Sequence, residues 1–446
     1  MSFRVGDQIT AAELAEWVSD ARRRTLELVA DLSDEQMMGP RLPTVNPLLW
    51  EIGHTAWFQE KWVLRHVCGE GPYRAEVDAL YDSIAIPHDT RWDLPLPSRG
   101  ATVEYLQATR NRVLEKLAER ELAAELLYHV QYTVFHEDMH NEAFVYARQT
   151  LGYPAPRLRG FAAADTDGES GSQAVSAPGD AGVPGGIFLL GAAREEPFVF
   201  DNEKWAHPVE VQPFAIARTP VTQAEFLGFV ENDGYAREEF WSPEGWTWRK
   251  AVAAEHPVYW RNEDGQWMRR DFDRWVRLEP QRPVIHVNWH EAQAYCRWAG
   301  RRLPTESEWE IAAAADIDSG GYMRFSPKRR YPWGENPPDA NHANTDLRRT
   351  GCINVGALPA SDSQVGCRQM LGNVWEWTES DFRPYPGFIA DPYKEYSEPW
   401  FGTHKVLRGG CWATRARLLR NTYRNFYTPD RRDVWAGFRT CRRTRE

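Results

Sequence analysis

Apolar residues recur at spacings of three and four along the first third of the chain, which is the periodicity of amphipathic helices. Four stretches carry it, and they run from Ala11 to Asp31, Pro47 to His66, Ala101 to Ala118 and Glu121 to Leu151. Asn46 suits the N-cap of the second helix and Pro47 its first turn. The pattern predicts a four-helix bundle within residues 1–160. The segment from Tyr81 to Trp92 is predicted to be a long loop, and such loops usually serve a site.

The pattern changes abruptly in the middle of the chain. Residues 161–183 are mostly Ala, Asp, Gly, Ser and Pro, so they are predicted to form a flexible linker. Short strands and turns, punctuated by Trp and Gly residues, dominate residues 184–446, with short helices at His290 to Trp298 and Thr305 to Ala313. Thr305 and Glu308 have the spacing of a capping box. The expected fold class is therefore α+β, with a helical bundle followed by a strand-rich domain.

Length, charge and cysteine content narrow the class of protein. The chain has 446 residues, which predicts two to three domains, and a formal net charge of −11 without a long basic run. This charge argues against a nucleic-acid partner. No apolar stretch is long enough to span a bilayer, and the N-terminus lacks the core of a signal peptide. The six scattered cysteines lack CxxC spacing, which predicts reduced thiols and a cytoplasmic location.

The strongest chemical signal is a set of three histidines. His136 and His140 are four residues apart in the last predicted helix, and this spacing turns both imidazoles toward one side. His54 lies in the second predicted helix, on its apolar face. Three residues about one turn away from it are aromatic, namely Trp50, Trp57 and Phe58. Three neutral imidazoles inside a bundle would bind a divalent metal and leave coordination positions open for a substrate and oxygen.

Two other classes of protein fit the same residues. His136-Glu137-x-x-His140 matches the zinc metallopeptidase motif, in which Glu137 would be the general base. However, no third histidine follows at the spacing of the long motif, and the next carboxylates, Asp165 and Asp167, fall in the predicted linker. In a non-catalytic binding module, the inward histidines would instead be hydrogen-bonded core residues without metal.

The second half carries a series of motifs whose order is informative. They are Pro184-Gly185-Gly186-Ile187, Pro220-Val221-Thr222-Gln223, Arg302-Leu303-Pro304-Thr305-Glu306, Gly372-Asn373-Val374-Trp375-Glu376-Trp377, Arg408-Gly409-Gly410-Cys411-Trp412 and Ala436-Gly437-Phe438-Arg439. Together, over residues 184–442, they resemble the formylglycine-generating/sulfatase-modifying domain, which implies a C-type-lectin-like fold. Residues 1–160 resemble a DinB-type bundle. The two domains in this order, with the three histidines, are similar to the non-haem iron sulfoxide synthases of ergothioneine biosynthesis.

The resemblance implies an iron(II)- and O2-dependent oxidoreductase whose iron is held by the three histidines. It would join a thiol to the imidazole C2 of hercynine, the trimethylbetaine of histidine, and oxidise the sulfur to a sulfoxide. Formylglycine-generating enzymes proper carry two copper-binding cysteines, and Thr414 and Leu419 stand at those positions. The lectin-like half is therefore expected to supply one wall of a site whose metal belongs to the bundle.

The resemblance also assigns roles to residues of the second half. In a Tyr-x-x-Tyr pair, Tyr393 is expected to be the proton donor and Tyr396 to contact hercynine. Tyr396 and Trp412 are candidates for an aromatic cage around the quaternary ammonium group. The alternative is that both tyrosines are packing residues of a loop. Cys411 stands where the family generally has serine, and it is expected to pack as a small apolar residue.

The donor pocket departs from the pattern of family members that use γ-glutamylcysteine. Those enzymes bind donor carboxylates through arginines after the second helix, where this chain keeps Arg91 but has His88 in place of another arginine. Arg417 stands at the position of an aspartate that binds the donor's amino group, and Arg420 matches the next charged residue. A guanidinium group would repel an ammonium group. Cysteine is therefore favoured as donor, and a selenosugar, as in the related selenoneine synthases, is the alternative.

Overall fold

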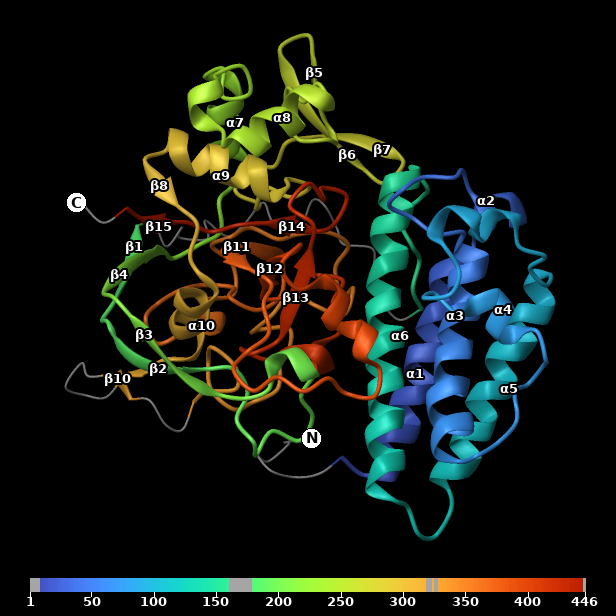
Figure 1. Ribbon diagram of the computed structural model, residues 1–446. Helices are drawn as coiled ribbons and strands as arrows, with labels where there is room; N and C mark the ends of the chain where they lie inside the picture. Colours follow the sequence, from blue (N-terminus) through green and yellow to red (C-terminus); the bar gives the residue numbers. More distant parts are fainter. Residues whose placement is uncertain (1–8, 160–178, 318–322, 325–327, 444–446) are drawn as a thin grey trace. The chain divides into compact units, whose positions relative to one another are not determined.

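The computed structural model describes residues 9–159, 179–317, 323–324 and 328–443 (Figure 1). The described chain forms two compact units. One consists of residues 9–159 together with 272–274, and the other contains the remaining described residues. The first is helical and the second combines short strands and helices, which confirms the α+β class.

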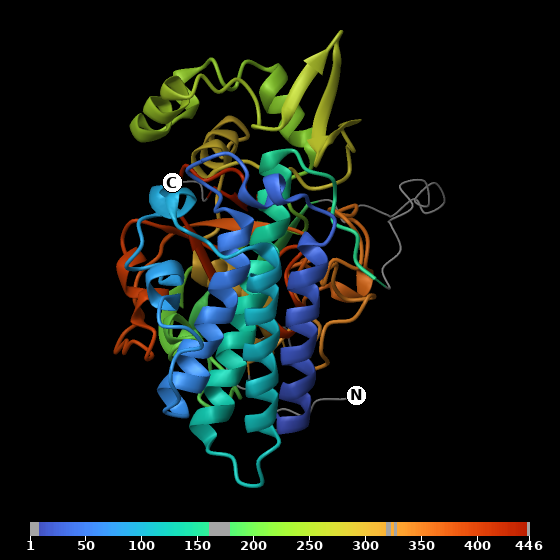
Figure 2. The ribbon, with the colours of Figure 1, turned by 90° about the vertical axis from the view of Figure 1, so that its right-hand side faces the viewer.

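Four long helical segments build the first unit. They are α1 (Ala11–Val29), α3 (Leu48–Gln59) with its continuation η1 (Glu60–Val67), α5 (Arg99–Leu117) and α6 (Ala124–Leu151). Both α1 and α3 lie against α5 and α6, and the four run side by side (Figure 2). Shorter helices in the connections are α2 (Asp34–Met38), α4 (Val77–Tyr81) and η2 (His88–Asp93). The predicted bundle is thus confirmed.

The core of the bundle follows the apolar periodicity of its helices. Leu14, Val18 and Ala21 of α1 are buried at spacings of four and three. They belong to one cluster with residues of the other segments, namely Val63, Leu64, Val113, Leu117, Leu126, Val130 and Val134. Helix α6 ends at Gly152, whose φ of 68° is the left-handed conformation that a helix C-terminus favours and that glycine adopts without steric cost.

The second helix differs from its prediction at both ends. Pro47, not Asn46, occupies the N-cap, and no side chain caps this end. The N-cap prediction for Asn46 is wrong because its side chain contacts Glu51 and Arg91 instead. From Glu60 to Val67 the helix has π-type hydrogen bonding, so Pro47 to His66 is not one continuous α-helix. The predicted loop after Tyr81 is also partly helical, since η2 occupies residues 88–93.

Two four-stranded sheets organise the second unit. The first has the order β1-β4-β15-β8, and its strands are β1 (Asp180–Val183), β4 (Phe214–Ala217), β15 (Cys441–Arg442) and β8 (Arg301–Arg302). The second has the order β13-β12-β11-β14, and its strands are β13 (Arg424–Tyr427), β12 (Lys405–Arg408), β11 (Trp375–Asp381) and β14 (Ala436–Gly437). Smaller sheets join β2 (Gly186–Leu190) to β3 (His207–Val211), β9 (Asp316–Ile317) to β10 (Met323–Arg324), and β5 (Trp260–Glu263), β6 (Gln266–Asp271) and β7 (Arg274–Arg277) to one another.

Strand β1 corrects the predicted domain boundary. Its residues Asp180–Val183 pair antiparallel with β4, although they fall in the stretch that was predicted to be linker. The last four residues of that linker therefore belong to the strand-rich domain. Residues 161–178, which make up most of the predicted linker, lie outside the described residues.

Helices α7 (Gln223–Glu231), α8 (Pro243–Ala251), α9 (Trp289–Trp298) and α10 (Glu306–Ala314) accompany the sheets. The last two confirm the short helices predicted from the sequence, each within one residue. The capping box is confirmed as well, because the Thr305 hydroxyl accepts from the backbone N–H of Glu308 while the Glu308 carboxylate accepts from that of Thr305.

Charged side chains lie inside this domain in closed pairs. Arg439 donates through Nε and Nη2 to the two carboxylate oxygens of Glu376, at 2.6 and 2.7 Å. Arg408 pairs with Glu306 and Glu310, and Arg424 pairs with Glu306. The Arg408 and Arg424 pairs connect α10 to strands β12 and β13, and the Arg439 pair connects β11 to the C-terminal segment. They tie segments that are distant in sequence to one core.

Candidate metal centre

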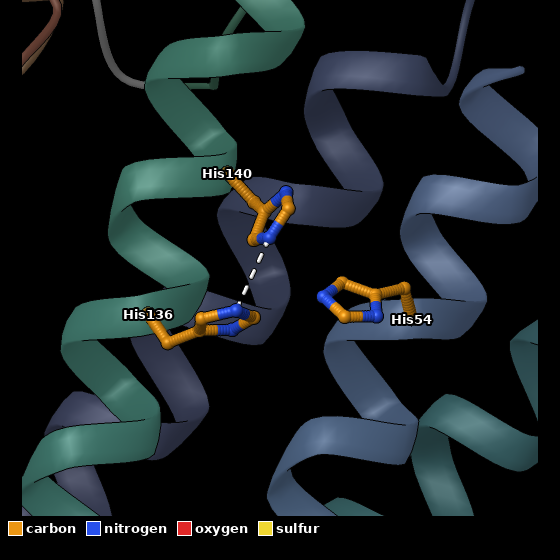
Figure 3. Close-up of side chains that lie close together, drawn as sticks. All are labelled: His54, His136 and His140. Carbon is orange, nitrogen blue, oxygen red and sulfur yellow. Dashed lines mark hydrogen bonds between the residues drawn. The ribbon is translucent and has the colours of Figure 1, made fainter. Parts of the chain in front are cut away.

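His54 on α3 and His136 and His140 on α6 turn their rings toward one another (Figure 3). One ligand nitrogen of each lies within 4.8 Å of the others, and the Nε2 atoms of His136 and His140 are 3.3 Å apart. Metal–imidazole bonds of about 2.0–2.1 Å require ligand nitrogens about 3–4 Å apart. The α6 pair already has this spacing, and His54 offers a ligand nitrogen within 4.8 Å of both. Among the described residues, no other group of three such side chains converges in this way.

The protonation state of His54 and His136 suits metal binding. Burial lowers the pKa of His54 and of His136 well below the usual value, and neighbouring His140 lowers both further. At neutral pH these imidazoles are therefore neutral and keep a lone pair for a metal. A donor set of imidazole nitrogens fits a divalent transition metal.

Two of the three rings are oriented by hydrogen bonds behind them. The Nδ1–H of His54 donates to the backbone carbonyl of Tyr81 at 2.8 Å, and that of His140 donates to the Glu51 carboxylate at 2.8 Å. A metal-binding histidine commonly donates its second nitrogen to a carbonyl or carboxylate in this way, which leaves Nε2 as the ligand atom. The ring of His136 is held differently, by stacking on Phe58 with centroids 3.6 Å apart.

Sequence reasoning did not find Glu51 or Tyr81. The signal for Glu51 was present, since it lies three residues before His54 and thus one turn away on the same helix. The glycine at position 53 was the sequence signal for a side chain packed closely against α3, and that side chain is Tyr81. A Cβ atom on residue 53 would lie 2.3 Å from Cε1 of the Tyr81 ring, so only glycine leaves room for it. Glycine therefore lets this ring pack against α3, where its carbonyl can reach His54.

The Glu137 carboxylate is engaged by Arg22 and Thr25 and not by the three histidines. Its carboxylate accepts from Arg22 Nε at 2.8 Å and Nη2 at 3.1 Å, and from the Thr25 hydroxyl at 2.7 Å. The side chain is only 1% exposed. This closed ion pair gives no support to the metallopeptidase alternative, because that mechanism needs a carboxylate free to activate water.

The two expected donor-binding residues of the bundle make contacts within it. Arg91 is buried and donates to the Asn46 side chain at 2.6 Å and to the carbonyl groups of Ser83 and Ile86. His88 Nε2 hydrogen-bonds the carbonyl of Val45 at 2.9 Å. Their roles in substrate binding stay predictions.

The two tyrosines of the second unit lie at a short 3-10 helix, η6 (Lys394–Tyr396). Tyr393 immediately precedes it and is half-buried. The ring of Tyr396 packs on Phe200 with centroids 4.9 Å apart. Burial, followed by the nearby Glu203 and Asp201 carboxylates, raises the pKa of Tyr396 above the usual value. A phenol in this setting keeps its proton at neutral pH.

The remaining candidates also lie in the second unit. Trp412 is fully buried and its ring is 4.8 Å from that of Trp435. Arg417 is half-buried in η8 (Ala416–Leu418). Arg420 is buried and its Nε donates to Glu203 at 2.9 Å, so its charge is already neutralised inside the domain. The structure thus brings the three histidines together as predicted, while the substrate roles of these residues stay predictions.

Two other sequence expectations can be compared with the structure. None of the six cysteines, all of which lie in described parts of the chain, forms a disulfide. None of the helices in the described ranges is long and apolar enough to cross a membrane.

Two family models match the chain. The model of the DinB superfamily matches residues 18–143, and that of the sulfatase-modifying factor enzyme 1-like domain matches residues 166–444. The two matches correspond to the helical unit and the strand-rich unit. The resemblances to both domains are therefore confirmed.

Curated proteins match over the length of both units. The chain is 40% identical to the hercynine oxygenase of Mycolicibacterium thermoresistibile, over 96% of this chain and 94% of that protein. It is 37% identical to the hercynine oxygenase of Mycolicibacterium smegmatis, over 97% and 99%. The formylglycine-generating enzyme of Streptomyces coelicolor is 32% identical over 59% of this chain and 89% of its own length. Because the first two similarities extend through both domains and include nearly all of each protein, the chain belongs to the hercynine oxygenase family.

Proposed function

We propose that this protein is an iron(II)-dependent enzyme that uses O2 to join a thiol to the imidazole C2 of hercynine and gives a sulfoxide. The observation that carries the proposal is the convergence of three imidazoles from α3 and α6 in a chain whose relatives are named hercynine oxygenases. In the balanced reaction, hercynine and the thiol supply four electrons to O2. One oxygen atom ends in the sulfoxide and the other in water.

His54, His136 and His140 would hold the metal through Nε2. Bound iron(II) would supply one-electron reduction of O2 and Lewis-acid binding of the thiolate, with coordination positions left open by the three protein ligands. The chain's own contribution is to orient two of these rings through Tyr81 and Glu51. Phe58 and Trp50 stack against ligand rings, so they keep water away from that side of the centre.

Tyr393 is proposed to donate a proton during the reduction of O2, and Tyr396 to line the hercynine pocket. The protonated state of Tyr396 supports a hydrogen-bonding role for its phenol. Trp412 is proposed to contact the quaternary ammonium group, which cannot donate hydrogen bonds and is recognised through aromatic faces.

Cysteine is proposed as the donor in preference to γ-glutamylcysteine. Arg417 stands at the family position of a carboxylate that binds the donor's amino group, and a second positive charge there opposes that ammonium group. The nearby Arg420 is paired with Glu203, and Arg417 is half-buried in η8.

The proposal is tested by a mass-spectrometric assay of anaerobically purified protein supplied with iron(II), O2 and hercynine. Cysteine, γ-glutamylcysteine and a selenosugar are offered separately, and O2 consumption is recorded in parallel. The expected result is a sulfoxide adduct with cysteine and O2 consumption that requires both substrates. A C–Se adduct formed only with the selenosugar would reassign the donor. An adduct formed only with γ-glutamylcysteine contradicts the role given to Arg417, and no adduct with any donor contradicts the proposed function.

Tyr393→Phe is expected to lower kcat for sulfoxide formation by about 10²- to 10⁴-fold, the usual contribution of a positioned proton donor. The change keeps the ring and removes only the hydroxyl group, so the bound iron per protein should stay at the wild-type value. Tyr427→Phe on β13 is the matched control, since Tyr427 is also half-buried in the same domain. Wild-type kcat in the Tyr393 variant would show that the phenol is a packing group.

A further inference from the structure

Arg91 has an unusual position for a residue that would bind a substrate carboxylate. It lies in η2, on the connection between α4 and α5, yet it is only 8% exposed because its side chain reaches back into the bundle. There its Nη2 donates to the carbonyl groups of Ser83 and Ile86, at 3.1 and 3.3 Å. The guanidinium group is therefore held by the bundle itself without any substrate.

One face of the guanidinium group lies over an aromatic ring that touches the metal centre. Arg91 Cζ is 4.0 Å from the centroid of the Trp50 ring. Trp50 in turn stacks on His54, with centroids 4.9 Å apart and planes inclined by 10°. Its indole N–H donates to the carbonyl of Leu80, which fixes the plane of the ring. Arg91 thus covers the side of Trp50 and holds it against a metal ligand.

The edge of the guanidinium group reaches a second ligand through hydrogen bonds. Arg91 Nη1 donates to Asn46 Oδ1 at 2.6 Å. Asn46 Nδ2 lies 3.4 Å from Glu51 Oε2 and donates to it, and Glu51 Oε1 accepts from His140 Nδ1 at 2.8 Å. This chain of contacts connects Arg91 to His140 within the bundle.

The direction of these hydrogen bonds depends on Arg91. A guanidinium group only donates, so it requires the oxygen of the Asn46 amide to face it. The amide NH2 must then face Glu51, where it is the correct partner for a carboxylate. If the amide were reversed, its oxygen would face the Glu51 carboxylate and repel it. Arg91 therefore selects the amide orientation that keeps Glu51 directed at His140.

We infer that Arg91 is a positioning residue of the metal centre, which holds His54 through Trp50 and His140 through Asn46 and Glu51. This inference rests on the proposed metal site but not on the identity of the substrate. A residue that only binds a donor carboxylate would not affect the metal centre in the absence of a donor. Replacement of Arg91 is expected to change the metal centre even when no donor is present.

The test is metal binding by metal-free protein in the absence of hercynine and of any thiol. Cobalt(II) is titrated into wild type, Arg91→Met and Arg91→Lys, and its visible absorption reports both the Kd and the ligand geometry. Arg91→Met is expected to weaken cobalt(II) binding on the order of tenfold, which is the low end for residues that support metal ligands. Arg91→Lys should be affected as well, because an ammonium group neither stacks nor reaches several acceptors as a guanidinium does. The cobalt spectrum of both variants should differ from wild type.

Arg148→Lys is the matched control. Arg148 is also buried in the bundle, but it bonds Asp31 and the carbonyls of Leu28 and Pro154, none of which is a partner of a ligand histidine. It should keep the wild-type Kd and spectrum, even if its thermal midpoint falls. Asn46→Ala isolates the hydrogen-bonded route. Its effect and that of Arg91→Met should be less than additive, since both interrupt the same chain.

Wild-type Kd and spectrum in both Arg91 variants would overturn the inference. Fully additive effects of Arg91→Met and Asn46→Ala would overturn the hydrogen-bonded route. If Arg91→Met does not fold, judged by its thermal midpoint without metal, Arg91→Lys and Asn46→Ala still decide the matter. Failure of the wild-type protein to bind cobalt(II) or iron(II) is a different result, because it removes the proposed metal site itself.

Discussion

His136→Ala is expected to abolish both metal binding and hercynine-dependent O2 consumption. His136 and His140 are the proposed chelating pair on α6, with Nε2 atoms 3.3 Å apart. Loss of one leaves His54 and His140 on separate helices, and two ligands from different elements bind a metal weakly. The expected fall in metal affinity exceeds the 10- to 100-fold that is typical when a residue behind a ligand is removed. Metal content after anaerobic loading and an oxygen-electrode assay measure the two effects.

His129→Ala is the control for this substitution. His129 is also buried on α6, and its Nδ1 hydrogen-bonds the carbonyl of Glu125, as the nitrogen of a ligand would. It lies two helical turns before His136 and outside the group of three converging histidines. Its variant should keep iron and activity. An iron-replete, active His136→Ala protein would exclude the metal centre described above.

Arg439→Met is expected to have the largest effect on stability in the strand-rich domain. Arg439 is fully buried and its guanidinium neutralises Glu376, which is 1% exposed. Removal of one partner of a buried ion pair leaves an uncompensated charge and typically costs about 3–5 kcal/mol. The free energy of unfolding, measured by urea denaturation with circular dichroism, should fall by this amount.

Two further variants separate the loss of the ion pair from the loss of packing. Arg439→Met combined with Glu376→Met removes both charges, so it should recover part of the lost free energy. Recovery should be incomplete, because Trp309 Nε1 also donates to Glu376 and would lose its acceptor. Arg237→Met is the surface control. Its ion pair with Glu239 is about half exposed, and pairs of this kind contribute about 0–1 kcal/mol. A loss below 1 kcal/mol for Arg439→Met would show that the pair is not needed for stability.

Local patterns predicted most of the architecture. The 3.6-residue periodicity of the bundle helices depends only on neighbouring residues, and all four predicted stretches contain a long helical segment. The placement of His136 and His140 on one side of their helix also follows from local spacing, because residues four apart are separated by about one helical turn. His54 could be placed inside the bundle from its aromatic neighbours. The order of motifs in the second half identified its domain type.

Hydrogen bonds between distant segments were not predictable in the same way. Strand β1 looked like linker because its composition is poor in apolar residues, yet its backbone pairs with β4. Asn46 looked like an N-cap, but packing gives it Arg91 and Glu51 as partners. Glu137 follows His136 directly in the sequence, and its partner Arg22 is 115 residues away.

The sequence by itself thus determined the two domains, their order and the three histidines that face the interior. Only the tertiary structure decided which polar groups meet those histidines, and that Arg91 contacts Asn46, Ser83 and Ile86 of the bundle. The physical reason is the separation along the chain over which each interaction acts. Helical periodicity and side-chain direction are set within one or two turns, whereas an ion pair or hydrogen bond forms only between atoms that packing has brought to about 3 Å.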